Sequence, residues 1–247
     1  MKHNISFVIP CFNCEKQIIQ NIKKLKNKIK SSRINFEFVM IDDGSEDGTF
    51  NKLNYLKKKF RFIKIFKNRE NIGKSFSLIK GVNRSKFKNI ITIDCDLPYL
   101  NSLKKVIEGL KRKNDLVIIN KKIKGSKMVG FNLRPYQILR YLIGSFIAYL
   151  NIKLLKINIH GGDTQAGLKG FKKTKDFNKI KFISKKFFFD LELVLIYTRK
   201  KLKVLSVKTD YSISMNSAIS LFNFSKNFVI LYEYINVVSY YLRGHNK

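Results

Sequence analysis

An apolar run that ends abruptly at two acids sets the strongest limit on how this chain can fold. Residues 89–98 read Asn-Ile-Ile-Thr-Ile-Asp-Cys-Asp-Leu-Pro, so a short β-branched segment is followed by Asp94 and Asp96. Such an unbroken apolar run predicts a strand that is buried on both faces, as in a parallel sheet. In open α/β sheets ligands bind at the carboxyl ends of the strands, so we expect both acids at a ligand site.

Asp94 and Asp96 are also candidate metal ligands. Two carboxylates one residue apart repel each other unless a positive charge lies between them. Mg²⁺ and Mn²⁺ take oxygen ligands and usually complete their coordination shell with substrate phosphates. The alternative is a solvated loop after a strand, because Asp-x-Asp is a common pattern, and the two acids alone leave that alternative open.

A second sign of a ligand site precedes this strand. The polar stretch 68–74 ends in Gly73 and Lys74, directly before a segment with helical periodicity. A loop glycine and a lysine at the start of a helix suit a bound phosphate, because the first amides of a helix attract anions.

Strand and helix patterns alternate along the first half of the chain. This alternation predicts a doubly wound, mostly parallel α/β sheet with right-handed crossovers. Besides the strand before Asp94, the expected strands are 5–9, 36–41, 61–66 and 115–119, and the expected helices are 15–30, one ending near 59, 74–84 and 99–113.

The pattern changes after residue 120. A basic loop over 120–134 precedes a long, mainly apolar helix over 135–157 with basic flanks. That helix fits either a buried core helix or a helix at a membrane interface. Residues 160–169 contain too much glycine to be core. The remaining expected elements are a helix over 187–202 with Asp190 and Glu192 in an apolar context, a strand over 203–209 and an aromatic helix over 219–242 that also suits lipid contact.

The charge of the chain indicates anionic partners. It carries 50 Lys and Arg against 17 Asp and Glu, a formal net charge of +33. Nucleic acid, a lipid surface and phosphorylated small molecules all fit such a balance. A compositionally biased genome would also produce part of this excess, since Lys, Asn and Ile are abundant while Trp is absent.

The chain shows neither of the usual targeting patterns. There is no stretch of about 20 uncharged apolar residues, so we expect no ordinary transmembrane helix. The first residues run directly into a strand, and we expect no signal peptide.

Cys11 and Cys14 form a C-x-x-C, but neither a second pair nor a thioredoxin-like context accompanies it. We therefore expect these two and Cys95 to be structural thiols in a reducing cytosol.

Six motifs follow one another in a diagnostic order. They are Phe-Val-Ile-Pro-Cys-Phe-Asn at 7–13, Ile-Asp-Asp-Gly-Ser-Glu-Asp-Gly-Thr at 41–49, the stretch 68–74, Asp-Cys-Asp-Leu-Pro at 94–98, Asp-Thr-Gln-Ala-Gly-Leu-Lys-Gly-Phe at 163–171 and Phe-Asp-Leu-Glu-Leu at 189–193. Together they resemble family 2 glycosyltransferases with a GT-A fold, and most closely the branch of dolichol-phosphate mannosyltransferases and polyprenyl-phosphate sugar transferases.

The resemblance implies a division of the chain. Residues 1–212 would form the GT-A domain, with a Rossmann-like nucleotide-sugar-binding half over 1–120 and an acceptor half with an amphipathic helical extension over 121–212. Residues 213–247 would form an apolar helix at a membrane interface.

The resemblance also implies roles for the matching residues. Asp94 and Asp96 correspond to the pair that binds Mg²⁺ or Mn²⁺, and Asp96 and Asp163 are the catalytic candidates. The donor side would include Pro10, Asn13, Asp42, Asp43, Lys74, Asp94 and Cys95; the acceptor or phosphate side would include Lys127, Arg134 and Gln165, with Glu192 as an acceptor-side or structural acid.

The activity implied is inverting transfer of a hexose from a UDP- or GDP-linked sugar to a polyprenyl or dolichyl phosphate. The protein would lie peripherally on the cytoplasmic face of an anionic membrane, alone or with a separate membrane-anchoring subunit. A lipid phosphate is already anionic and needs no strong base, whereas a saccharide hydroxyl needs a carboxylate base, for which Asp163 is the candidate.

Three other readings stay open. The same fold could glycosylate a saccharide hydroxyl in surface-polysaccharide or glycolipid assembly, or it could be a catalytically inactive relative. A nucleic-acid binder is disfavoured, because the lysines are spread along the chain and no nucleic-acid motif is visible.

Overall fold

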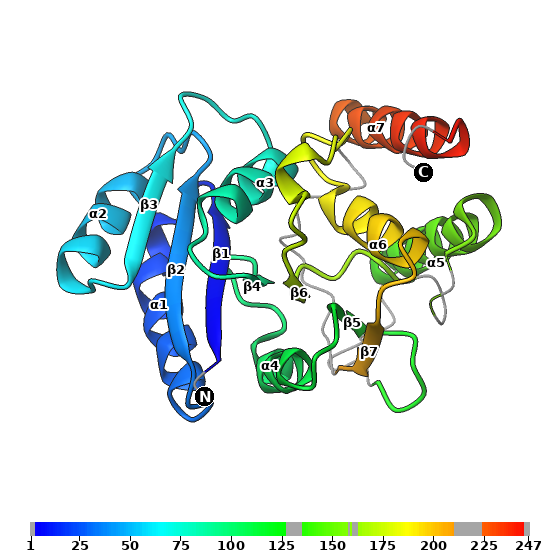
Figure 1. Cartoon of the computed structure of the whole chain (residues 1–247). Helices are drawn as coiled ribbons and strands as arrows, with labels where there is room; N and C mark the ends of the chain where they lie inside the picture. Colours follow the sequence, from blue (N-terminus) through cyan, green and yellow to red (C-terminus); the bar gives the residue numbers. More distant parts are fainter. Residues whose placement is uncertain (1–2, 127–134, 158, 160–162, 210–223, 245–247) are drawn as a thin grey trace.

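A seven-stranded sheet runs through the centre of the molecule (Figure 1). The structure is a computed structural model and describes residues 3–126, 135–157, 159, 163–209 and 224–244. The strand order is β3-β2-β1-β4-β6-β5-β7, and only β6 pairs antiparallel with its neighbours. The mostly parallel α/β sheet is therefore confirmed. The strands are β1 (Asn4–Cys11), β2 (Asn35–Asp42), β3 (Ile63–Lys67), β4 (Asn89–Thr92), β5 (Leu116–Asn120), β6 (Lys169–Lys172) and β7 (Val204–Lys208).

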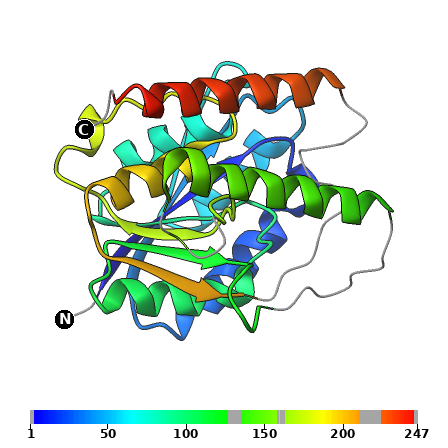
Figure 2. The same ribbon diagram turned by 90° about the vertical axis from the view of Figure 1, so that its right-hand side faces the viewer.

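Helices cover both faces of the sheet, as strands buried on both sides require. Along β1, Phe7 and Ile9 face the cluster that contains α1, α2 and α4, while Val8 faces the cluster with α3 and α6. Figure 2 shows α5 and α7 side by side across the outer surface, over α6. The helices are α1 (Glu15–Lys30), α2 (Thr49–Lys59), α3 (Lys74–Arg84), α4 (Leu103–Lys111), α5 (Pro135–Leu155), α6 (Phe189–Arg199) and α7 (Phe224–Leu242), with short 3-10 turns at Leu100–Ser102 and Phe177–Lys179.

The glycine-rich stretch was predicted wrongly. Of residues 163–169, all except Gln165 are buried, and strand β6 begins at Lys169 between β4 and β5. Residues 160–162 lie outside the described part of the chain. Glycine is needed here for close approach: a Cβ on Gly170 would lie 2.6 Å from Val106 Cγ1 and 3.0 Å from Leu110 Cδ1 on α4. Gly170, directly after this stretch, therefore serves to pack a helix against the sheet. Within the stretch, Gly167 lies so close to the Asp94 carboxylate that a Cβ would not fit.

The second half of the chain otherwise follows the expected order, with shorter elements. The long helix ends at Leu155, the helix expected over 187–202 spans Phe189–Arg199, and α7 begins at Phe224. Residues 219–223 of the expected C-terminal helix lie outside the described residues. Within the described ranges, no helix has the length and apolar character needed to cross a membrane.

The close packing of α4 on β6 predicts the effect of adding one methyl group. Gly170→Ala should lower the free energy of unfolding by about 1–3 kcal/mol, because the new Cβ overpacks the core against Val106. Urea denaturation of the two proteins measures the difference. Gly144→Ala on α5 is the matched control, since a Cβ there meets nothing within 4 Å. That control should be neutral or stabilising by up to about 1 kcal/mol. Equal stability of wild type and Gly170→Ala would contradict the spacing of α4 and β6.

Candidate active site at the carboxyl edge of the sheet

The predicted ligand residues gather where the strand order reverses. Strand β1 lies between β2 and β4, so the chain leaves the sheet in different directions on its two sides, which is where α/β sheets bind ligands. Asp43 follows β2, Asp94 follows β4, and Lys74 is the first residue of α3. The structure thus brings together acids and a lysine that lie up to 51 residues apart in sequence, from Asp43 to Asp94.

A chain of alternating charges lies beneath this edge. Lys74 Nζ is 2.6 Å from Asp94 Oδ1 and 3.9 Å from Asp190 Oδ2. On its other side Asp190 Oδ1 is 2.8 Å from Lys169 Nζ, which also donates to the carbonyl of Ala166. Lys169 and Asp190 are only 1% and 2% exposed. The four side chains come from α3, the loop after β4, α6 and β6, so this network joins both halves of the fold.

The surroundings of these lysines shift their pKa values in opposite directions. Burial alone would lower the pKa of Lys74, but the Asp94 and Asp190 carboxylates raise it above its usual value. Burial lowers the pKa of Lys169, although Asp190 opposes that shift. Lys74 is thus a firmly charged ammonium group at the open edge of the site.

Asp43 organises the loop that carries Lys74. Its carboxylate accepts hydrogen bonds from Asn68 Nδ2 (2.7 Å) and from the amides of Ile72 (3.3 Å) and Gly73 (2.9 Å). Gly73 has φ of +123°, a conformation that favours glycine. Asp43 was predicted to contact the nucleotide; the structure places its oxygens on the loop that presents Lys74.

The other predicted donor-side residues surround the same edge. The backbone amide of Asn13 donates to Ser45 Oγ (3.1 Å), and the side-chain Oδ1 of Asn13 accepts from the backbone amide of Glu46. Asn13 therefore links the loop after β1 to the loop after β2. Pro10 lies near the end of β1 and is half-buried. Asp42 is fully buried, and this burial raises its pKa.

The three thiols meet at this edge as well. Cys11 and Cys14 are buried, Cys95 is half-buried, and all are free. The neighbouring Cys11 and Cys95 side chains lower the pKa of Cys14, while burial opposes that shift. The carbonyl of Cys95 accepts from Asn21 Nδ2 (3.0 Å), which holds the loop between Asp94 and Asp96 against α1.

The donor set at Asp94 and Asp96 fits a hard divalent cation that also binds substrate phosphates. The structure contains no group of three or more His, Cys, Asp or Glu able to hold a metal within its described ranges. Mg²⁺ commonly uses one or two protein carboxylates and takes its other ligands from phosphates and water. Asp96 is exposed, and its pKa is raised by partial desolvation and by the nearby Asp94 carboxylate. A cation would relieve that repulsion, so the residues fit the group.

The acceptor side is organised around Asp163. This residue is 6% exposed, its Oδ2 accepts from the amide of Lys121 (2.7 Å), and its Oδ1 lies 3.7 Å from Lys121 Nζ. Gln165 is exposed and donates to Thr164 Oγ1 (3.4 Å). Lys127 and Arg134, predicted for the acceptor phosphate, lie outside the described residues.

Glu192 lies inside the protein and away from the open edge. It is fully buried on α6 and accepts from the amides of Ile183 (2.9 Å) and Ser184 (2.7 Å) and from Tyr241 Oη (3.1 Å). Burial raises its pKa to about 7. Of the two roles predicted for this acid, these contacts fit the structural one.

Sequence reasoning missed the roles of Lys169 and Lys121. Lys169 follows Gly-Leu and precedes Gly-Phe, and a lysine in so apolar a setting must be paired if it is buried. Asp190 in an apolar helix carried the same signal. The pairing itself could not be read from the sequence, because the two residues meet only through the placement of β6 beside α6.

Comparison with known proteins agrees with this geometry. The family described as Glycosyl transferase family 2 matches residues 6–174. Dolichyl-phosphate beta-glucosyltransferase ALG5D of Trichomonas vaginalis is 24% identical over 221 residues, which cover 84% of this chain and 65% of that protein. The dolichol-phosphate mannosyltransferase of Pyrococcus furiosus is 26% identical over 125 residues, covering 50% of this chain and 35% of that protein. The chain thus matches less than two thirds of the length of each relative.

Solved structures show the same fold. Mannosyl-3-phosphoglycerate synthase from Rubrobacter xylanophilus superposes with a TM-score of 0.71 at 14% identity, covering 98% of this chain and 75% of that one. Glucosyl-3-phosphoglycerate synthase from Mycobacterium tuberculosis, crystallised with Mn²⁺, UDP and glucosyl-3-phosphoglycerate, gives 0.65 at 15% identity, covering 96% and 80%. These likenesses confirm the GT-A fold. Because the family model matches more than half of the chain, the chain belongs to glycosyl transferase family 2.

Proposed function

We propose that the protein is an inverting glycosyltransferase that moves a hexose from a UDP- or GDP-linked donor to a polyprenyl or dolichyl phosphate. Membership of the family supports the transfer chemistry. The printed activities of the two relatives, a dolichyl-phosphate glucosyltransferase and a dolichol-phosphate mannosyltransferase, support the acceptor class.

The contacts between Asp163 and Lys121 are the observation that favours a phosphate over a hydroxyl group as the acceptor. A general base must reach the acceptor hydroxyl with a free lone pair. Asp163 is buried, and its two oxygens face the backbone amide and the ammonium group of Lys121. Such a carboxylate is suited to fixing the loop after β5, with Lys121 and Lys122 at the acceptor side. A phosphate acceptor is already an anionic nucleophile, so it fits an acceptor side whose described residues offer Lys121 and Lys122 and an acid, Asp163, that is already engaged.

The donor side supports departure of a nucleoside diphosphate. Lys74 presents a fixed positive charge at the start of α3, held by Asp94 and Asp190. Asp96 and Asp94 would hold the Mg²⁺ or Mn²⁺ ion, which offsets charge that develops on the leaving diphosphate. The acceptor phosphate oxygen attacks the anomeric carbon from the face opposite the leaving group, so one bond forms as the other breaks and the configuration inverts.

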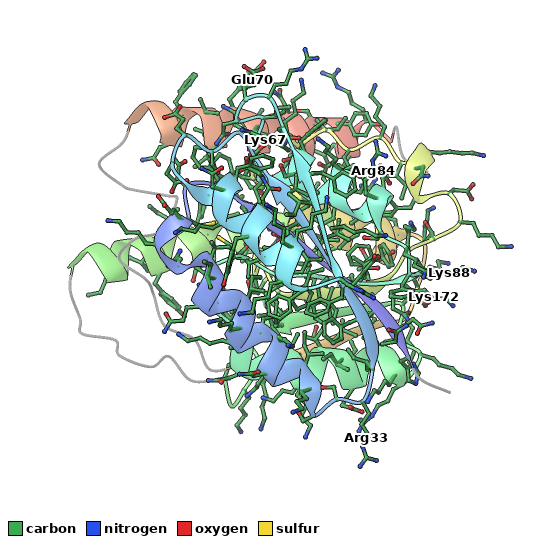
Figure 3. The ribbon with its side chains drawn as sticks, turned by 90° about the vertical axis from the view of Figure 1, so that its left-hand side faces the viewer. Arg33, Lys67, Glu70, Arg84, Lys88 and Lys172 are labelled. Atoms are coloured by element: carbon green, nitrogen blue, oxygen red, sulfur yellow. The ribbon has the colours of Figure 1, made fainter. Side chains whose placement is uncertain are left out.

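The competing functions have less support. Transfer to a saccharide hydroxyl would need a base in place of the engaged Asp163. A nucleic-acid binder would gather its cations on one surface. Figure 3 instead shows basic side chains spread over the view, with Arg33 at its lower end and Lys67 in its upper part.

Replacing Asp96 tests the donor site. Titration of wild type with UDP and with GDP should show tighter binding in the presence of Mn²⁺ for one of the two nucleotides. Asp96→Asn should lose roughly tenfold or more of that metal-dependent gain, because the amide removes a charged ligand. Asp176→Asn is the matched control, since Asp176 is exposed and pairs with Lys179 (3.5 Å) away from the site. Failure of wild type to bind either nucleotide would overturn the proposed donor class.

The outer face of α5 and α7 supports peripheral contact with an anionic membrane on its cytoplasmic side. The two helices lie side by side (Figure 2), joined by a hydrogen bond from Tyr234 Oη to Asn151 Oδ1 (3.0 Å). Basic residues near an anionic leaflet add about 1 kcal/mol each. Exposed apolar side chains on this face include Leu142, Phe146 and Tyr149 on α5 and Phe228, Leu231, Tyr232 and Ile235 on α7.

Polar substitutions on this face test the membrane contact. The double variant Phe146→Ser, Tyr232→Ser should bind at least about tenfold more weakly to vesicles containing phosphatidylglycerol, because two apolar side chains no longer leave water. Cosedimentation with vesicles measures the effect. Tyr55→Ser on α2 is the control, because Tyr55 is similarly exposed but lies on the opposite side of the sheet. If wild type does not cosediment with the vesicles, direct membrane contact is excluded, and the face would instead suit a separate membrane-anchoring subunit.

A further inference from the structure

A short segment before α6, residues 183–188, links the C-terminal helix to the donor side. Two carboxylates bind its successive amides. Glu192 on α6 accepts from Ile183 and Ser184. Glu233 on α7 accepts from Lys185 (2.7 Å), Lys186 (2.7 Å) and Phe187 (3.0 Å). Five consecutive amides, 183–187, therefore depend on two acids, and three of them depend on a helix that begins 36 residues after Phe188.

The opposite side of this segment contacts the first turn of α3. The carbonyl oxygens of Lys185 and Lys186 accept from the amides of Phe76 (2.9 Å) and Ser75 (3.1 Å). The hydroxyl groups of Ser75 and Ser184 lie 3.0 Å apart. Gly73 packs so closely here that a Cβ would lie 2.7 Å from the carbonyl oxygen of Lys185. The segment therefore forms the backing of the turn that presents Lys74.

These bonds have a direction that suits a positioning role. A peptide unit whose amide points at Glu233 points its carbonyl the other way, toward α3. Without an acceptor at Glu233, the three amides would lose their partner on α7. Those of Lys185 and Lys186 belong to exposed residues and would turn to water, and that of half-buried Phe187 would have to follow them to find a new partner. The segment would then rotate toward water, and the bonds to Ser75 and Phe76 would weaken.

The same helix also reaches the acceptor side. Tyr234, next to Glu233, donates to Asn151 on α5, and Asn151 Nδ2 lies 3.5 Å from Thr164 Oγ1, beside Asp163. Tyr241 on the last turn of α7 donates to Glu192. When α7 is packed against the protein, it therefore contacts residues on both the donor side and the acceptor side of the site.

We propose that Glu233 is a positioning residue for Lys74, so that docking of α7 and binding of the donor phosphates are energetically coupled. The proposal rests on the proposed function for the identity of the ligand, but the coupling itself concerns only this chain. Coupling of two binding events is reciprocal, so nucleotide binding should stabilise the contact of α7 with the 183–188 segment.

Nucleotide titration of Glu233 variants tests the proposal. With Mn²⁺ present, Glu233→Ala should bind the preferred nucleotide, UDP or GDP, about tenfold more weakly than wild type. Glu233→Gln keeps one carbonyl oxygen for two of the three amides, so its affinity should fall only about threefold. The matched control is Glu108→Gln, because Glu108 pairs with Lys111 (2.9 Å) on α4. A merely structural role would lower the melting temperature and leave the affinity of the folded protein unchanged.

Hydrogen exchange gives a readout that needs no nucleotide. In Glu233→Ala, exchange should accelerate at residues 185–187 and also at Ser75 and Phe76, while Glu108→Gln should match wild type. Acceleration confined to residues 185–187 would overturn the coupling, and so would nucleotide affinity equal to that of wild type in both Glu233 variants. If wild type binds no nucleotide, the proposed function fails, and exchange at Ser75 and Phe76 still decides whether Glu233 positions the α3 turn.

Discussion

The ion pair between Lys169 and Asp190 is the interaction on which the rest of the site depends. Both side chains are almost fully buried, and removing one partner of such a pair leaves a charge without compensation at a cost of about 3–5 kcal/mol. The pair joins β6 to α6, and through Asp190 it reaches Lys74 at the start of α3. Lys74 in turn holds Asp94. The position of the first predicted metal ligand is therefore set from inside the core.

This arrangement gives the two acids after β4 different tasks. Asp94 is engaged by Lys74 at 2.6 Å, whereas Asp96 is exposed at the edge of the sheet. In the proposed reaction Asp96 is thus the more available carboxylate for a cation, and Asp94 fixes the lysine that faces the phosphates. On the acceptor side, similarly, Asp163 is engaged by Lys121 at the start of the loop after β5.

Much of the first half of the fold could be predicted from the sequence. Apolar runs such as 89–93 identify buried strands, and acids at their ends identify the carboxyl edge, because parallel strands share that edge. Residues 163–169 were misjudged because glycine signals both surface turns and close packing, and Gly167 lies against the Asp94 carboxylate. Gly170 shows the second case, against Val106 on α4.

Contacts that depend on the tertiary fold were harder to predict. The sequence marks Asp190 and Glu192 as acids in an apolar helix, but not which lysine or which amides they meet. Lys169 reaches Asp190 only because β6 inserts antiparallel between β4 and β5. Glu233 reaches the 183–188 segment only because α7 lies over α6. Neither placement follows from periodicity. The acceptor-side prediction for Lys127 and Arg134 stays a prediction, since both lie beyond the described residues.

In the proposed reaction the acceptor is a lipid phosphate, whose attack on the sugar needs no carboxylate base. The most direct measurement is sugar transfer from UDP- and GDP-hexoses with Mn²⁺ to a polyprenyl phosphate and to the matching polyprenol, using wild type and Asp163→Gln. We expect a sugar-linked lipid from the phosphate alone, with Asp163→Gln retaining turnover once the acceptor is saturating. Transfer to the polyprenol or to a saccharide hydroxyl, abolished by Asp163→Gln, would contradict it and make Asp163 the base.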